Sequence, residues 1–273
     1  MKKLFFPILV FSATAFTVPA GNEFSAKAIS KEYSKIKENI YLNKYEVSNV
    51  AYRDFLSAIQ LSDPEKYISC LPDTTVWHSL ISYNDPFSAY YFRHPAYDNY
   101  PVVGVSFESA NAYCQWLTES YNADEKRKFN KVVFRLPSIE EWQLAANGGD
   151  DGKQYPWGSG YIKNNRNMQL CNYKNDAELI YNPDTKKYYT AATPAEPGHI
   201  KTIVTSPVKS FYPSSFGMYN MSGNVAEMVA YKGIAMGGGF NDAAWDVTVK
   251  SEKRYNGPSA DIGFRVLMEV IEK

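Results

Sequence analysis

Two stretches of the chain place apolar residues at helical spacing. After Ser48 the apolar positions are Val50, Ala51, Phe55 and Leu56. After Ser106 they are Ala110, Tyr113, Cys114 and Leu117, which fall on one helical face. A serine just before such a run can accept hydrogen bonds from the unpaired N–H groups of the first helical turn. We therefore expect two amphipathic helices, each starting after its serine and burying its apolar face.

Shorter apolar runs predict strands. They are Ile40–Val47, Pro101–Val105 and Val132–Pro137. A hairpin is also expected, because Leu179–Tyr181 and Lys187–Tyr189 flank the turn sequence Asn182-Pro183-Asp184-Thr185.

A capping-box signature marks one more helix. Ser138 is followed three residues later by Glu141, so each side chain can accept from the other residue's backbone N–H. The short helix around Trp142 should end at Asn147-Gly148-Gly149-Asp150, where glycine permits a left-handed terminal residue.

Long stretches lie between these elements. We read Ser62–Tyr100 as an irregular insertion and Cys171–Val204 as a second one. No internal repeat or flexible linker divides the chain. Few helices, many short strands and long loops predict a single domain of the α+β class with little regular secondary structure.

Composition narrows the class of partner. Lys+Arg and Asp+Glu each total 29 among 273 residues, so the net charge is zero. Nucleic-acid binding requires clustered excess positive charge, and we expect none. We also expect no transmembrane segment, because the apolar run near the N-terminus is shorter than the roughly 20 residues that a spanning helix needs.

The N-terminal residues resemble an export signal. Lys2 and Lys3 precede the apolar run Leu4–Phe11, and small residues then offer cleavage after Ala15 or after Ala20. We assign residues 1–20 to a signal peptide and residues 21–273 to one domain. The protein is expected to be periplasmic, outer-membrane-associated or extracellular. The first thirty residues contain no cysteine, so we expect no lipid anchor. Whether Cys70, Cys114 and Cys171 form a disulfide is left open.

Six blocks of sequence carry a resemblance to a known family. In chain order they are Tyr45–Asn49, Pro101–Trp116, Arg135–Trp142, Tyr155–Gly158, Phe216–Glu227 and Gly237–Arg265. Their order and spacing resemble the formylglycine-generating enzyme, or sulfatase-modifying factor, family. The resemblance implies that family's variant of the C-type lectin fold.

The block ending at Glu227 looks like the family's structural calcium loop. The resemblance implies that calcium is held by the Asn220 side chain, the carbonyls of Gly223 and Val225, and the Glu227 carboxylate. Such oxygen ligands suit a hard cation. The alternative is a loop in which Glu227 pairs with an arginine and Asn224 makes a turn. Arg265 is expected to bury its stem and pair with a carboxylate.

The last block lies where active family members place two copper-binding cysteines. Those positions read Asp242 and Val247 here. Copper(I) selects soft sulfur ligands, which neither residue supplies, so we expect no copper and no catalytic residue. We expect no iron either, because His78, His94 and His199 are scattered through loops. His94 is expected to pack or form hydrogen bonds within its own block.

Three carboxylates lie near the former copper positions. Asp242, Asp246 and Asp261 are candidates for an acidic patch in the old active-site groove, or else are solvated loop residues. A narrower likeness adds a context for such a groove. His94–Val105 looks like the same block in the gliding-motility and type IX secretion lipoproteins of Bacteroidetes.

These observations leave three hypotheses about function. The first is an exported, non-catalytic binding or scaffold protein of a bacterial envelope, gliding or type IX secretion system, with an envelope or secreted protein as partner. The second is a formylglycine-generating-type oxidoreductase, or another enzyme acting on a peptide in the same groove. The third is a lectin-like carbohydrate binder, motivated by the 22 tyrosines.

Overall fold

The computed structural model of the chain describes residues 25–79, 85–174, 177–192 and 204–273. The predicted signal peptide and both cleavage positions lie outside these ranges. The helices, with short 3-10 turns labelled η, are α1 (Ala26–Glu32), α2 (Asn49–Ile59), α3 (Pro64–Ser69), η1 (Thr74–Ser79), α4 (Asp85–Tyr90), η2 (Pro95–Tyr97), α5 (Phe107–Ala123), α6 (Ile139–Asn147) and η3 (Ala244–Asp246). The strands are β1 (Tyr33–Lys37), β2 (Ile40–Asn43), β3 (Lys131–Arg135), β4 (Ala177–Asn182), β5 (Lys187–Ala192), β6 (Ala226–Met228), β7 (Ile234–Met236), β8 (Glu252–Arg254), β9 (Ile262–Phe264) and β10 (Leu267–Glu272).

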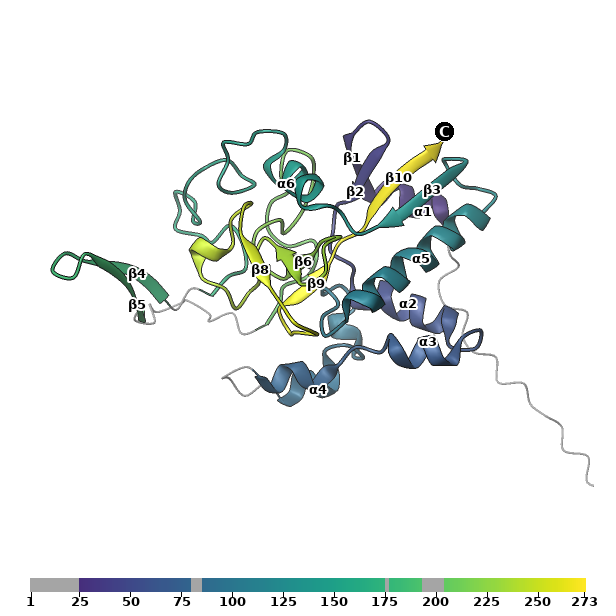
Figure 1. Cartoon of the computed structure of the whole chain (residues 1–273), viewed down its shortest axis with the longest axis horizontal. Coiled ribbons are helices and arrows are strands. Elements are labelled where there is room, and N and C mark those ends of the chain that lie inside the picture. Colours follow the sequence, from purple (N-terminus) through teal and green to yellow (C-terminus); the bar gives the residue numbers. More distant parts are fainter. Residues whose placement is uncertain (1–24, 80–84, 175–176, 193–203) are drawn as a thin grey trace, which may run out of the picture.

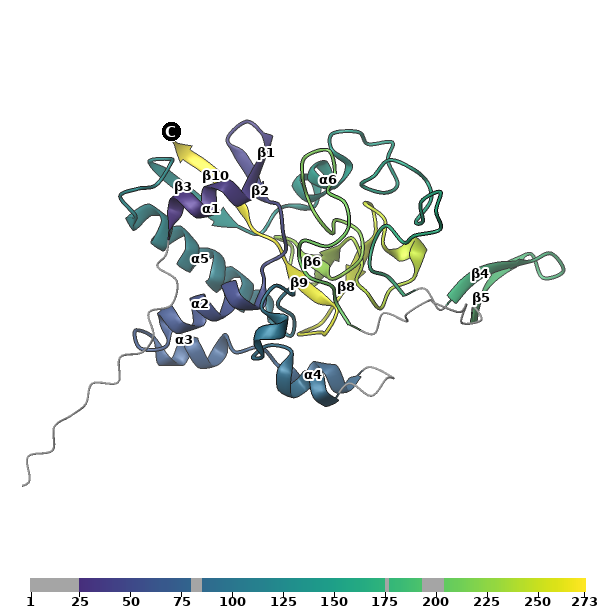
Figure 2. The ribbon, with the colours of Figure 1, turned by 180° about the vertical axis from the view of Figure 1, so that it is seen from behind.

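The described strands form two four-stranded sheets and one hairpin. The first sheet has the order β1-β2-β10-β3, and the second has the order β8-β7-β6-β9. The pair β6–β9 is parallel, with Glu227 opposite Gly263, and the other pairs of the second sheet are antiparallel. The hairpin β4–β5 extends away from the rest of the chain in both Figure 1 and Figure 2. The predicted hairpin and the predicted α+β class are both confirmed.

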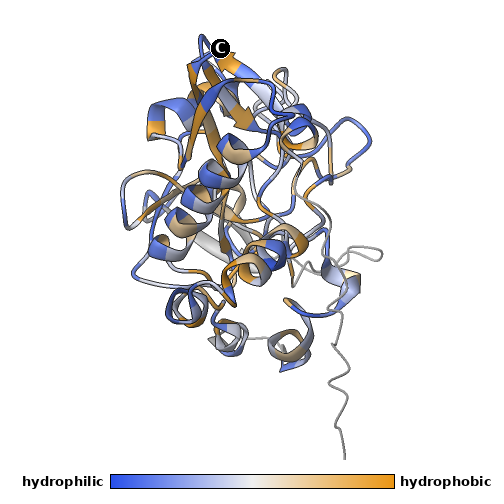
Figure 3. Ribbon diagram, turned by 90° about the vertical axis from the view of Figure 1, so that its right-hand side faces the viewer, coloured by the Kyte–Doolittle hydropathy of each residue, from blue (hydrophilic) through white to orange (hydrophobic). Residues whose placement is uncertain are grey.

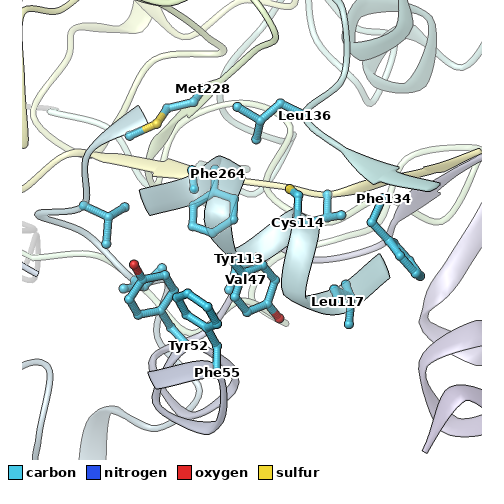
Figure 4. Packing of buried hydrophobic residues seen from close by; sticks show 14 of the residues in the cluster. Val47, Tyr52, Phe55, Tyr113, Cys114, Leu117, Phe134, Leu136, Met228 and Phe264 are labelled. Carbon is cyan, nitrogen blue, oxygen red and sulfur yellow. The ribbon is translucent and has the colours of Figure 1, made fainter. Parts of the chain in front are cut away.

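An aromatic core joins the two long helices to the second sheet. Tyr52 and Phe55 of α2 pack on Tyr113 of α5, with ring centroids 5.9 and 5.6 Å apart. Tyr113 in turn meets Phe264 of β9 edge to face at 5.5 Å, and Figure 4 shows these rings gathered together. Figure 3 shows helices and strands changing between polar and apolar residues along their length, as amphipathic elements do.

The helix starts follow the predicted caps. Ser48 and Ser106 accept hydrogen bonds from Ala51 N and Ser109 N, and both serines have extended backbones. Ser138 and Glu141 form the reciprocal capping box of α6, and Gly148 ends that helix in the left-handed conformation.

One predicted strand is wrong. Of Pro101–Val105, only Pro101 makes a bridge, to Ser48. Gly104 turns the backbone with a φ of 72°, so the run cannot continue as a strand. The valines between these residues are buried as irregular chain. An apolar run of this length predicts that its side chains are buried, but it does not predict the backbone conformation.

Two further expectations need correction. The predicted strand Ile40–Val47 stops at Asn43, because the Asn43 side chain accepts from Tyr45 N and turns the chain. Ser62–Tyr100 is not irregular: its described part holds α3, η1, α4 and η2. Asp63 caps α3 and His94 caps η2, each with proline in the first turn. The expectation that His94 forms hydrogen bonds within its own block is confirmed.

All three cysteines are buried and free, so no disulfide links them. Across the described ranges, no helix combines the length and the apolar character that crossing a bilayer requires.

Candidate functional site

The loop Tyr219–Glu227 runs into β6 and needs glycine at its centre. Gly223 has a φ of 71°, and a Cβ there would lie 2.2 Å from the carbonyl oxygen of Asn172. The same carbonyl accepts from Asn224 N at 2.7 Å. The loop is therefore pressed against the segment that contains Asn172, and no side chain fits between them.

Glu227 of β6 forms a fully buried ion pair with Arg265, which lies between β9 and β10. Arg265 donates from Nε to Glu227 Oε2 at 2.9 Å and from Nη2 to Oε1 at 2.6 Å. Trp142 Nε1 also donates to Oε2, at 2.7 Å. The other bonds of the guanidinium go to the carbonyls of Asn43 and Tyr219. The expectation that Arg265 pairs with a carboxylate is confirmed, and the pair joins both sheets to the loop.

A second buried carboxylate lies behind the same loop. Glu46 accepts from Asn224 Nδ2 at 2.7 Å through Oε1 and from Asn220 Nδ2 at 3.1 Å through Oε2. Burial raises the pKa of Glu46 to about 8, with Arg265 opposing the rise and Glu227 adding to it. Neither the calcium motif nor any local pattern pointed to Glu46. The only signal in the sequence is its place in the block Tyr45–Asn49.

A buried amide oxygen of this loop lacks a hydrogen-bond partner among the described residues. Asn220 Oδ1 is buried and accepts no hydrogen bond from the described residues, so it is an oxygen without a partner. Glu227 keeps acceptor capacity at Oε1, where Arg265 donates one bond. No group of three or more His, Cys, Asp or Glu residues suited to a metal occurs in the described ranges. Calcium here would depend on amide and backbone oxygens beside the carboxylates. It stays a prediction.

Two of the three candidate carboxylates, Asp242 and Asp261, are bridged by Lys253, which the sequence analysis did not identify. Lys253 of β8 donates to Asp242 at 2.6 and 2.7 Å and to Asp261 at 2.6 Å. Asp242 also accepts from Gly239 N, and Asp261 accepts from Ser259 Oγ. The alternative of freely solvated carboxylates is therefore wrong for these two residues.

The pKa values of Lys253 and Asp246 are both raised above their ordinary values. Burial acts to lower the pKa of Lys253, but Asp261 and Asp242 outweigh it, so the pKa is raised above its ordinary value. Burial and the charge of Asp242 raise the pKa of Asp246.

The second former copper position is apolar and closed. Val247 is fully buried in a cluster with Tyr155, Cys171 and Tyr173. The presence of Cys171 in this cluster was not foreseen. Burial raises the pKa of the thiols of Cys114 and Cys171 far above the usual range, so both stay protonated. Copper(I) selects sulfur ligands, and neither Asp242 nor Val247 carries sulfur.

Comparison with known proteins identifies a family for the chain. Residues 13–270 match the model of the sulfatase-modifying factor enzyme 1-like domain. A formylglycine-generating enzyme from Thermomonospora curvata is 28% identical over 208 residues, covering 69% of this chain and 58% of that protein. The inactive C-alpha-formylglycine-generating enzyme 2 from Bos taurus is 33% identical over 132 residues, covering 48% of this chain and 33% of that protein. The chain thus spans between a third and three fifths of these two relatives.

Solved structures support the fold. CarF aligns with a TM-score of 0.53 at 19% identity, covering 85% of this chain and 86% of that one. Treponema denticola variable protein 1 aligns with a TM-score of 0.51 at 17% identity, covering 84% of each chain. The fold is consistent with the expected variant of the C-type lectin fold. Because the family match spans residues 13–270, the chain belongs to the family of sulfatase-modifying factor enzyme 1-like domains.

Proposed function

We propose that this protein is a non-catalytic member of its family. It would act as an exported binding or scaffold component of a bacterial envelope, in a gliding or type IX secretion system. The family fold is retained. The residues that would perform the oxidation are not.

One observation carries the non-catalytic part of the proposal. At the first copper position Asp242 is paired with Lys253, and at the second Val247 is sealed in an apolar cluster. The two positions hold a carboxylate paired with an ammonium group and an apolar side chain, where copper(I) requires two thiolates. Cys171 packs in the same cluster as Val247, but Cys70 and Cys114 lie in a different core cluster, so no second thiolate is available there.

The relatives and the sequence support the remaining parts. The family includes proteins described as inactive, from Bos taurus and from Mus musculus, at 33% and 34% identity to this chain. The signal-like N-terminus supports export. The block His94–Val105 supports the envelope context and an envelope or secreted protein as the partner. Calcium would brace the loop Asn220–Glu227 as a structural ion.

Catalysis is tested with a cysteine-containing sulfatase-type peptide, copper(I) and oxygen, with the Thermomonospora curvata enzyme as positive control. We expect no formylglycine product and no copper retained after gel filtration. The double variant Asp242→Cys/Val247→Cys restores both sulfur ligands and should retain copper if the site is otherwise intact. Formylglycine formed by the unaltered protein would overturn the proposal.

Export is tested by producing the full chain in a bacterial host and sequencing the N-terminus of the mature protein. Cleavage should leave Phe16 or Gly21 as the first residue, in the periplasmic or envelope fraction. An uncleaved chain confined to the cytoplasm would contradict the envelope role. Crosslinking in the native envelope, with peptide identification at the crosslinked groove residues, would then identify the partner.

A further inference from the structure

The hairpin β4–β5 has two outer edges that no other described strand joins. Its two strands pair only with each other, through six residue pairs that run from Ala177 opposite Ala192 to Asn182 opposite Lys187 without a bulge. Figure 1 and Figure 2 show the hairpin extending away from both four-stranded sheets. Every second residue of each outer edge therefore directs a backbone N–H and C=O group away from the hairpin, where another strand could bind them.

Two outer strands of the four-stranded sheets, β1 and β8, have local features that hinder the addition of a strand. β1 contains Lys35 and Lys37, with a bulge between them. β8 is three residues long, and all three are charged. Lysine, a bulge and a short length are each known to protect an exposed sheet edge.

The other two outer strands, β3 and β9, are covered by other parts of the chain. The Asn122 side chain of α5 accepts from Val132 N at 3.0 Å and donates to Val132 O at 2.9 Å, so α5 occupies the free side of β3. Val47 N donates to Phe264 O at the end of β9, at 2.9 Å. The edges of both larger sheets are thus either blocked or already bonded.

β4 has none of these protections. Its six residues include no lysine and no proline, and Glu178 is the one charged residue among them. Ile180 and Tyr181 favour extended chain. β5, in contrast, begins with Lys187. Because an isolated two-stranded hairpin is only marginally stable in water, a further strand added along β4 would stabilise it.

We propose that β4 pairs with β4 of a second copy of this chain, antiparallel and about a two-fold axis, giving a four-stranded sheet in the order β5-β4-β4-β5. The placement of charge favours this occupant. With the axis at Ile180, Glu178 of each copy lies opposite Asn182 of the other copy, and Asn182 is the neighbour of Lys187. Each glutamate thus lies near a lysine of the other copy, and the two glutamates lie at opposite ends of the new strand pair. The pairing goes beyond the proposed function and does not depend on it.

Sedimentation velocity of the purified protein over a range of concentrations tests the pairing, and we expect a reversible dimer. Ile180→Lys places two lysines opposite each other at the axis and should weaken association about tenfold, because like charges directly opposite destabilise a strand pair. Tyr189→Lys is the matched control. Tyr189 lies opposite Ile180 within the hairpin, on the strand that stays outermost, so the same added charge there should leave association unchanged.

Two further variants keep the test decisive if a lysine disturbs the hairpin itself. Glu178→Lys should weaken the dimer, and adding Lys187→Glu should restore it, because the two charges are then exchanged. Ile180→Cys should crosslink to its counterpart under mild oxidation, since residues that face each other across a strand pair are close enough for a disulfide, whereas Tyr189→Cys should not.

Three results would overturn the proposal. The first is an unaltered protein that stays monomeric at every concentration, including one that instead binds an extended segment of another protein along β4. The second is association that is equally strong in Ile180→Lys. The third is association that only Tyr189→Lys weakens, because β5 would then be the pairing edge.

Discussion

Arg265 and Glu227 form a two-point ion pair from which solvent is excluded on both sides. The pair connects the end of β9 to β6, and further bonds from the guanidinium reach the end of β2 and the start of the candidate calcium loop. A single side chain thus holds together four segments that are far apart in the sequence. Arg265 stabilises the fold mainly because removing it would leave the buried Glu227 carboxylate without a cation.

Replacing Arg265 with Met should be strongly destabilising. Glu227 would keep only the Trp142 bond, and an uncompensated buried carboxylate costs about 3–5 kcal/mol of unfolding free energy. Urea unfolding at neutral pH measures the loss, with Arg254→Met as control, because Arg254 is exposed on β8. Adding Glu227→Gln to Arg265→Met should recover part of the loss, since no charge then remains to be buried. Equal losses in the single and double variants would contradict this account.

The backbone at Gly223 offers a second prediction. Gly223→Ala should destabilise by more than the about 1–2 kcal/mol expected from a left-handed backbone alone, because its Cβ would also clash with the Asn172 carbonyl. Gly149→Ala is the matched control, since its φ of 85° is also left-handed while a Cβ there meets only Phe216, at 3.9 Å. Thermal unfolding of the two variants measures the difference. Similar melting temperatures would show that the loop can move away from Asn172.

Local chemistry explains what the sequence predicted well. The caps at Ser48, Ser106 and Ser138 each depend on groups within three residues, so they can be read without knowing the fold. The short helices of Ser62–Tyr100 have three to six residues and too few turns to show a periodic face. Asp63 followed by Pro64 is a local start signal for α3, but helices this short depend mainly on tertiary packing, which the sequence does not show.

The sequence predicted the site residues that lie in recognisable motifs and missed those that join the site only through folding. The motif identified Glu227, and Arg265 was expected to find some carboxylate. Glu46 lies 174 positions from Asn220, and its contact with the loop exists only in the folded chain. Lys253 likewise has nothing beside it in the sequence that marks a bridge between Asp242 and Asp261. The calcium ion remains a prediction.

The ion pair between Arg135 and Glu141, at the start of α6, should make the free energy of unfolding depend on pH in the acid range. Arg135 donates to both oxygens of Glu141 at 2.7 Å, and these bonds lower the pKa of Glu141 below its ordinary 4.5. A group with a depressed folded pKa contributes stability above its unfolded pKa, and the contribution is lost as the pH falls through the folded value.

Glu141→Gln should therefore lower the unfolding free energy by about 1 kcal/mol at neutral pH. Its difference from the unaltered protein should shrink as the pH falls from about 5 to 3. Urea unfolding across this range tests the prediction, with Glu125→Gln accounting for the loss of an exposed carboxylate. A difference that stays constant with pH would exclude the linkage.

Lys253→Met tests whether the ammonium group stabilises the fold by neutralising Asp242 and Asp261. Asp242 and Asp261 would then face each other without a cation, and because the side chains are partly exposed we expect a loss of about 1–2 kcal/mol of unfolding free energy at neutral pH.

The pKa of Lys253 is raised above its ordinary 10.5, so its contribution to stability is present below that pH and is lost as the pH rises through the folded value. The gap between variant and unaltered protein should therefore narrow in strong alkali. Lys250→Met, which removes an exposed lysine nearby, should cost little. An equal loss in both variants would contradict a stabilising role for the ion pairs of Lys253 with Asp242 and Asp261.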